Sequence, residues 1–164
     1  MRYRQFAMFI LIVFLPAACN RYSHEGKIEV KNPWVRAFVI NEESVQSGSH
    51  SQTDEDMDRM KFNSAAYLLL INHGDEPERL LKAESDVADS VEIHISEMKD
   101  GVMRMRPVDW IEIPPRGQVE LKPAGLHIML VGVNRELVAG DKVDLVITFM
   151  NVGEMQVEAE VRIP

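Results

Sequence analysis

The stretch VEIHISEMKDGVMRMRPV, residues 91–108, predicts a β-hairpin and fixes which of its side chains share a face. Asp100-Gly101 is the strongest short-range signal for a two-residue hairpin loop, because both residue types tolerate positive φ. With these residues as the loop, Lys99 faces Val102, and the remaining cross-strand pairs follow in register. One face then carries His94, Ser96, Met98, Met103 and Met105. A three-residue loop would put the other set of side chains of the second strand on the face of His94, so the prediction depends on the length of the turn.

This face holds side chains that could share a metal ion. His94 and Met105 become diagonal neighbours with Cα atoms about 7 Å apart, a distance that two long side chains can span. The stretch AGLHIMLVG at 124–132 is strand-like, and its alternation places His127 and Met129 on one face. Two imidazoles and two or more thioethers would meet if this strand lies beside the hairpin. Such a soft, neutral donor set favours Cu(I) over zinc, calcium or magnesium.

Short apolar stretches separated by turn signals run along most of the chain, and no segment keeps a convincing helical apolar stripe over three turns. The best helical candidate is the brief ESDVADS at 84–90. We therefore expect an all-β antiparallel sandwich or barrel, forming one domain over residues 27–164. The expected strands are 27–31, 34–39, 65–72, 90–96, 102–108, 118–122, 126–132, 142–150 and 156–163.

Residues 1–18 have the pattern of an export signal, with two arginines, an apolar stretch of ten residues and a zone of small residues. The sequence LPAAC that ends at Cys19 resembles a bacterial lipobox, in which the cysteine is lipidated and becomes the mature N-terminus. Pro16 stands where that pattern prefers leucine. We expect a signal peptide of the lipoprotein type, followed by a tether at 19–26.

This interpretation places the protein in the periplasm, held to a membrane only through its lipid. In enteric bacteria an aspartate directly after the lipidated cysteine retains lipoproteins at the inner membrane. The residue at this position is Asn20, which favours the outer membrane. Ordinary cleavage and a soluble periplasmic product are the alternative. The formal net charge is −8 and becomes −10 without residues 1–18, which carry two arginines and no acidic residue. An acidic surface argues against nucleic acid as a partner.

A polar segment at 41–61 interrupts the strands and carries six acidic and two basic residues. It reads as a long solvated insertion. Its His50, Met57 and Met60 are candidate auxiliary metal ligands, as are Met98 and Met103 of the hairpin.

The spacing from His94 to Met105, His127 and Met129 resembles the H-x10-M-x21-H-x-M signature of the PCu(A)C family of periplasmic copper chaperones. The flanking sequences PWVRA, AAYLLLINHG and IEIPPRGQVELKPAG resemble that family as well, over about residues 28–163. The resemblance implies a cupredoxin-like β-sandwich with a Greek-key barrel, and a Cu(I) site made by these four residues. It also implies delivery of copper to the Cu(A) subunit of a respiratory oxidase, alongside a Sco-type thiol protein.

Three other functions remain open from the sequence. A copper-buffering or resistance protein would sequester the metal, and the histidine and methionines of the insertion favour this modestly. A structural lipoprotein would use the same residues for packing. An oxidoreductase is the weakest alternative, because electron-transfer copper sites use a thiolate and Cys19 is the only cysteine. Nothing resembles a catalytic triad, a phosphate loop or a carboxylate pair, so we expect a monomeric binding protein and no enzyme.

Overall fold

The computed structural model describes residues 27–39 and 62–164, and within these ranges it contains β-strands and no helix. The long alternating stretches form the longest strands, as their residue pattern predicts. The ten strands are β1 Ile28–Arg36, β2 Asn63–Asn72, β3 Glu78–Glu84, β4 Ala88–Lys99, β5 Val102–Pro107, β6 Ile111–Ile113, β7 Gln118–Leu121, β8 Leu126–Val133, β9 Lys142–Phe149 and β10 Gly153–Arg162.

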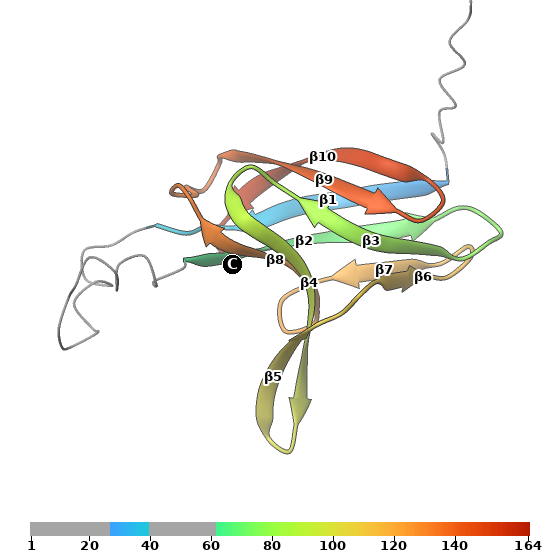
Figure 1. Cartoon of the computed structure of the whole chain (residues 1–164), viewed down its shortest axis with the longest axis horizontal. Helices are drawn as coiled ribbons and strands as arrows, with labels where there is room; N and C mark the ends of the chain where they lie inside the picture. Colours follow the sequence, from blue (N-terminus) through green and yellow to red (C-terminus); the bar gives the residue numbers. More distant parts are fainter. Residues whose placement is uncertain (1–26, 40–61) are drawn as a thin grey trace, which may run out of the picture.

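All ten strands belong to one continuous sheet that curls around a single core (Figure 1). The strand order is β5-β4-β8-β2-β1-β10-β9-β3-β6, and β7 pairs with the far end of β2. The ends of the sheet approach each other, because β3 contacts β4 and β6 contacts β7. Every pair is antiparallel except β1 with β10, which is parallel. The sheet therefore differs from the expected antiparallel arrangement only at the parallel pair of β1 and β10.

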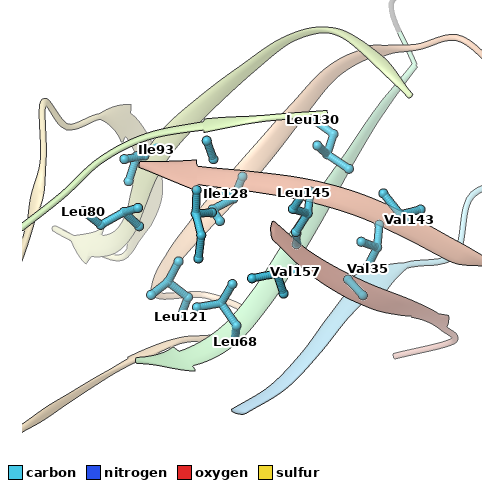
Figure 2. Packing of buried hydrophobic residues seen from close by; sticks show 14 of the residues in the cluster. Val35, Leu68, Leu80, Ile93, Leu121, Ile128, Leu130, Val143, Leu145 and Val157 are labelled. Atoms are coloured by element: carbon cyan, nitrogen blue, oxygen red, sulfur yellow. The ribbon is translucent and has the colours of Figure 1, made fainter. Parts of the chain in front are cut away.

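Strict alternation of apolar and polar side chains builds the core. β9 is the clearest case, since Val143, Leu145, Ile147 and Phe149 are buried while the residues between them are more exposed. On the opposite side of the core, Ile93 of β4 and Ile128 of β8 are register partners that point inward (Figure 2). Neighbours of these two residues on the same strands must then point to the outer face of the sheet.

The β4–β5 hairpin has the register that the sequence predicts. Lys99 pairs with Val102, and Ser96 pairs with Met105. The turn residues Asp100 and Gly101 have φ of 53° and 77°, as a type I′ turn requires. The hairpin projects from the body of the sandwich, and β5 is an edge strand whose residues are all exposed (Figure 1).

Two local expectations are wrong, and two strands were missed. The helical candidate at 84–90 is a turn followed by the start of β4, because seven residues without a sustained apolar stripe cannot hold a helix in isolation. β3 and β6 were not expected, since one is half charged and the other has only three residues. The strands expected at 27–31 and 34–39 are one strand, interrupted by a bulge between Lys31 and Trp34.

The predicted signal peptide, Cys19, the tether and the insertion at 41–61 lie outside the described residues. So do the candidate ligands His50, Met57 and Met60. In the part of the chain that the structure describes, no helix is long and apolar enough to cross a membrane.

We expect Leu145→Ala to lower the free energy of unfolding by about 2–5 kcal/mol, because the leucine is fully buried and its removal leaves a cavity. Urea denaturation measures this change. Leu81→Ala is the matched control, since Leu81 is 41% exposed, and it should cost no more than about 0.5 kcal/mol. Equal losses in the two variants would contradict the placement of the core.

Candidate metal centre

His94 of β4 and His127 of β8 are direct cross-strand partners. Their ring centroids lie 5.8 Å apart, and the ring planes make an angle of 65°. Both rings lie on the outer face, because the neighbouring pair Ile93–Ile128 points into the core. The pairing of β4 with β8 thus brings together two histidines that are separated by 32 intervening residues.

His127 presents one ring nitrogen that has no partner. The side chain is only 3% exposed, and Nδ1 lies 2.9 Å from the carbonyl oxygen of Gly125. A carbonyl can only accept, so Nδ1 carries the proton and donates it. In the neutral ring the lone pair is then on Nε2, which is buried and makes no hydrogen bond within the described residues.

In His94 the roles of the two ring nitrogens are reversed, because Nε2 is the hydrogen-bonded one. Its Nε2 lies 2.7 Å from Oε2 of Glu92, the residue two positions earlier on the same face of β4. The carboxylate accepts the Nε2 proton, which leaves the lone pair of the neutral ring on Nδ1. Nδ1 is also buried and without a partner among the described residues. A carboxylate that holds the distal nitrogen of a histidine is the usual orienting contact behind a metal ligand.

Two aromatic side chains extend from His127 across the neighbouring strands. The ring of Tyr67 on β2 lies 6.4 Å from that of His127, and the ring of Trp34 on β1 lies 4.4 Å from that of Tyr67. Burial lowers the pKa of His127, and the hydrogen bond to the Gly125 carbonyl opposes this by raising it. Electrostatic repulsion from Arg36, and from His94 whenever that ring is protonated, lowers the pKa of His127 further. Burial also raises the pKa of Tyr67. Both effects favour neutral rings at this position.

The two thioethers of the predicted set occupy neighbouring register positions. Met129 lies two residues beyond His127 on the same face of β8 and pairs with Glu92 of β4. Met105 of β5 pairs with Ser96 and is therefore diagonal to His94. The four predicted residues lie on adjacent strands in the order β5, β4, β8 and on one face. Met98 and Met103 form the next pair toward the hairpin tip.

This arrangement can bind a soft ion better than a hard one. Within residues 27–39 and 62–164, no group of three or more His, Cys, Asp or Glu side chains could hold a metal. The donors available at the histidine pair are two neutral imidazole nitrogens and the thioethers beside them. A set of this kind suits a monovalent soft metal, because it adds no negative charge that a hard divalent ion would require.

Two residues of this centre were not identified from the sequence. Glu92 shares the face of His94 by simple alternation, and an acidic residue two positions from a candidate ligand is a usable signal for an orienting contact. Tyr67 gives no such local signal, because its position beside His127 depends on the pairing of β2 with β8.

The model of the LpqE-like family matches residues 28–161 of this chain. The chain belongs to the LpqE-like family. Among individual proteins, RP573 of Rickettsia prowazekii is 35% identical over 88 residues, which are 53% of this chain and 49% of RP573. The chain spans about half the length of the curated relatives that it matches.

Solved structures agree over nearly the whole domain. The copper-bound PCuAC domain from PmoF2 has 27% sequence identity and a TM-score of 0.60, covering 85% of this chain and 95% of that domain. Apo-DR1885 from Deinococcus radiodurans has 25% identity and a TM-score of 0.58, covering 100% of this chain and 97% of DR1885. The resemblance to PCu(A)C domains and the expected all-β cupredoxin-like fold are confirmed by this agreement.

In the metal-free protein we expect His127 to be the neutral Nδ1–H tautomer and to titrate below the ordinary value of about 6.5. Because the unfolded chain binds this proton more readily, the contribution of His127 to stability is complete above pH about 6.5. It is lost as the pH falls through the lowered pKa. Nitrogen-15 NMR of the imidazole rings over a pH series measures both properties.

The same protein unfolded in urea is the control, and its His127 should titrate near 6.5. A Glu92→Leu variant tests the second ring, since it should release the tautomer of His94 and leave that of His127 unchanged. An Nε2–H tautomer at His127, or a pKa above the unfolded value, would contradict this description of the site.

Proposed function

We propose that this protein binds one Cu(I) ion at His94, Met105, His127 and Met129 and hands it to another protein. The observation that carries the proposal is the pair of buried ring nitrogens without partners. Leaving a buried polar group unsatisfied costs about 1–3 kcal/mol, so two such atoms side by side require an explanation. A shared metal ion supplies it, because both lone pairs would then be used.

The donor types support Cu(I) as that ion. Thioether sulfur is a soft ligand, and the described part of the chain offers no thiolate or carboxylate cluster that would select zinc or calcium. The PmoF2 domain, which shares this fold at 27% identity, is itself described as copper-bound. Neutral ligands also leave the bound monovalent ion with a single positive charge, which lowers the cost of holding it near the sandwich.

Unequal exposure of the four side chains suggests how the ion would leave. His127 is almost completely buried, whereas Met105 lies on the exposed edge strand and is 51% exposed. An incoming ligand from an acceptor can displace Met105 first, while the two imidazoles keep hold of the ion. Transfer by successive ligand exchange then needs no step at which Cu(I) is free in water. The protein would act as a binding and delivery protein without catalysing a reaction.

The cellular setting of this proposal follows the sequence. Export by residues 1–18 and lipidation of Cys19 would hold the protein at the outer membrane on the periplasmic side, as a monomer. The acceptor would be the Cu(A) subunit of a respiratory oxidase, with a Sco-type thiol protein as a further participant. An acidic surface would favour association with a basic docking partner.

Met105→Leu together with Met129→Leu should abolish retention of Cu(I) against a competing chelator while leaving the fold intact. Leucine keeps nearly the volume of methionine but offers no sulfur to the metal. Competition titration measures the affinity, and circular dichroism checks the fold. The control is Met150→Leu with Met155→Leu, because neither methionine lies on β4, β5 or β8, the strands that carry the proposed ligands. Unchanged Cu(I) affinity in the first variant would remove the ligand assignment.

A copper-buffering protein is the second candidate, favoured by His50, Met57 and Met60 in the insertion at 41–61. We expect the Cu(I)-loaded protein to transfer its ion to an apo Cu(A) domain, and to do so equally well when residues 41–61 are replaced by a short linker. A transfer assay followed by the Cu(A) absorption measures this. Retention of copper, with a copper-to-protein ratio clearly above one that drops in the deletion variant, would favour buffering instead.

A further inference from the structure

The projecting β4–β5 hairpin carries a face of exposed methionines beyond the histidine pair. Met98, Met103 and Met105 are 64%, 49% and 51% exposed. Methionine is a residue of cores and binding surfaces, and none of these three side chains is among those that pack on the described core. The opposite face of the hairpin carries Glu97, Lys99, Arg104 and Arg106 beside Ile95 and Val102, so the thioethers gather on one face and the charged side chains on the other.

The backbone pairing brings these thioethers close to one another. Val108 donates to the carbonyl of Ile93, which makes that pair hydrogen-bonded, and such pairs alternate along an antiparallel ladder. Met98–Met103 and Ser96–Met105 therefore occupy non-hydrogen-bonded positions, where opposite Cα atoms are about 4.5 Å apart and side chains are closest. Two sulfurs on flexible side chains can thus approach a single ion from Met98 and Met103.

Met105 stands between the two groups of ligands. It is diagonal to His94 on one side and to Met98 on the other, because its own partner is Ser96, which lies between them on β4. Serine is small and 8% exposed, so it leaves the Met105 thioether room to turn toward either neighbour. One side chain can therefore belong to the histidine site and to a site nearer the hairpin tip.

We propose that Met98 and Met103, with Met105 as the shared ligand, form a second Cu(I) site through which the ion enters and leaves the histidine pair. This inference rests on the proposed function. A site of two or three thioethers is exposed and has no imidazole, so it would hold Cu(I) more weakly than the histidine site. Movement between the sites exchanges one neutral ligand for another. The ion stays Cu(I), and no proton is released, because thioethers carry none.

Silver(I) titration of the purified full chain, labelled at the methionine methyl groups, tests this site by NMR. Silver(I) serves as a redox-inert substitute for Cu(I). The first equivalent should shift the Met105 and Met129 methyls. Further silver should then shift Met98 and Met103, with a second phase at Met105. In the variant Met98→Leu with Met103→Leu, the first phase should remain and the second phase at Met105 should be lost. The control Met150→Leu with Met155→Leu should keep both phases.

The outcomes separate this inference from the function on which it rests. If Met105 and Met129 respond while Met98 and Met103 stay unshifted at several equivalents, the histidine site stands and the second site is overturned. The methionine face would then be an apolar docking surface for the acceptor. If the first equivalent leaves Met105 and Met129 unshifted, the proposed function itself fails. A second phase at Met105 that survives in the Met98→Leu, Met103→Leu variant would also overturn the second site.

Discussion

The pairing of β4 with β8 is the constraint on which the candidate site depends. It sets His94 opposite His127, and a shift of one residue would turn one of the two rings into the core. The inward pair Ile93–Ile128 opposes such a shift, since the isoleucine of the strand that shifts would lose its buried position. The free energy that holds the site in register is thus the ordinary hydrophobic free energy of the sandwich. The packing of the inner face of β4 and β8 therefore fixes the positions of the histidines on the outer face.

The histidine pair keeps this geometry at a cost. Two imidazole nitrogens are buried without partners, although water would satisfy them if the rings turned outward. Glu92 and the Gly125 carbonyl prevent that movement by holding the other nitrogen of each ring, and Tyr67 fills the space behind His127. The lone pairs are therefore aimed before any ligand arrives. A preorganised site of this kind spends little of its binding energy on ordering side chains.

Much of this arrangement could be predicted from the sequence, and the limits have physical causes. The hairpin register followed from Asp100-Gly101, because a two-residue loop admits one parity, and the structure has that parity at every pair. Alternation along 126–132 correctly placed His127 off the apolar face. That β8 lies beside β4 could not be derived locally, since strand order depends on long-range pairing. Glu92 shares the face of His94 by alternation, but the hydrogen bond between the two side chains was established only by the structure.

The strands that were missed show where alternation fails as a signal. β3 reads ERLLKAE and begins with Glu78, a charged residue that is nonetheless buried. Its carboxylate accepts hydrogen bonds from the backbone of Arg79, Asn151 and Val152, so tertiary contacts satisfy a side chain that looks like a loop residue. The bulge in β1 has a similar origin, because Asn32 at a φ of 49° precedes a proline that cannot donate to the ladder. Both features arise from backbone hydrogen bonding that residue hydrophobicity does not report.

The position of the site in the sheet links stability to exchange. β8 is held between β4 and β2, and β4 between β8 and β5, so both histidines lie on strands with partners on each side. Met105 instead lies on β5, which pairs only with β4 among the described strands and has no buried residue. Edge strands with few packed side chains open at lower free energy than interior strands. In the proposed site the two histidines would therefore hold the ion on interior strands of the sheet, and Met105 would yield to an acceptor from the edge strand.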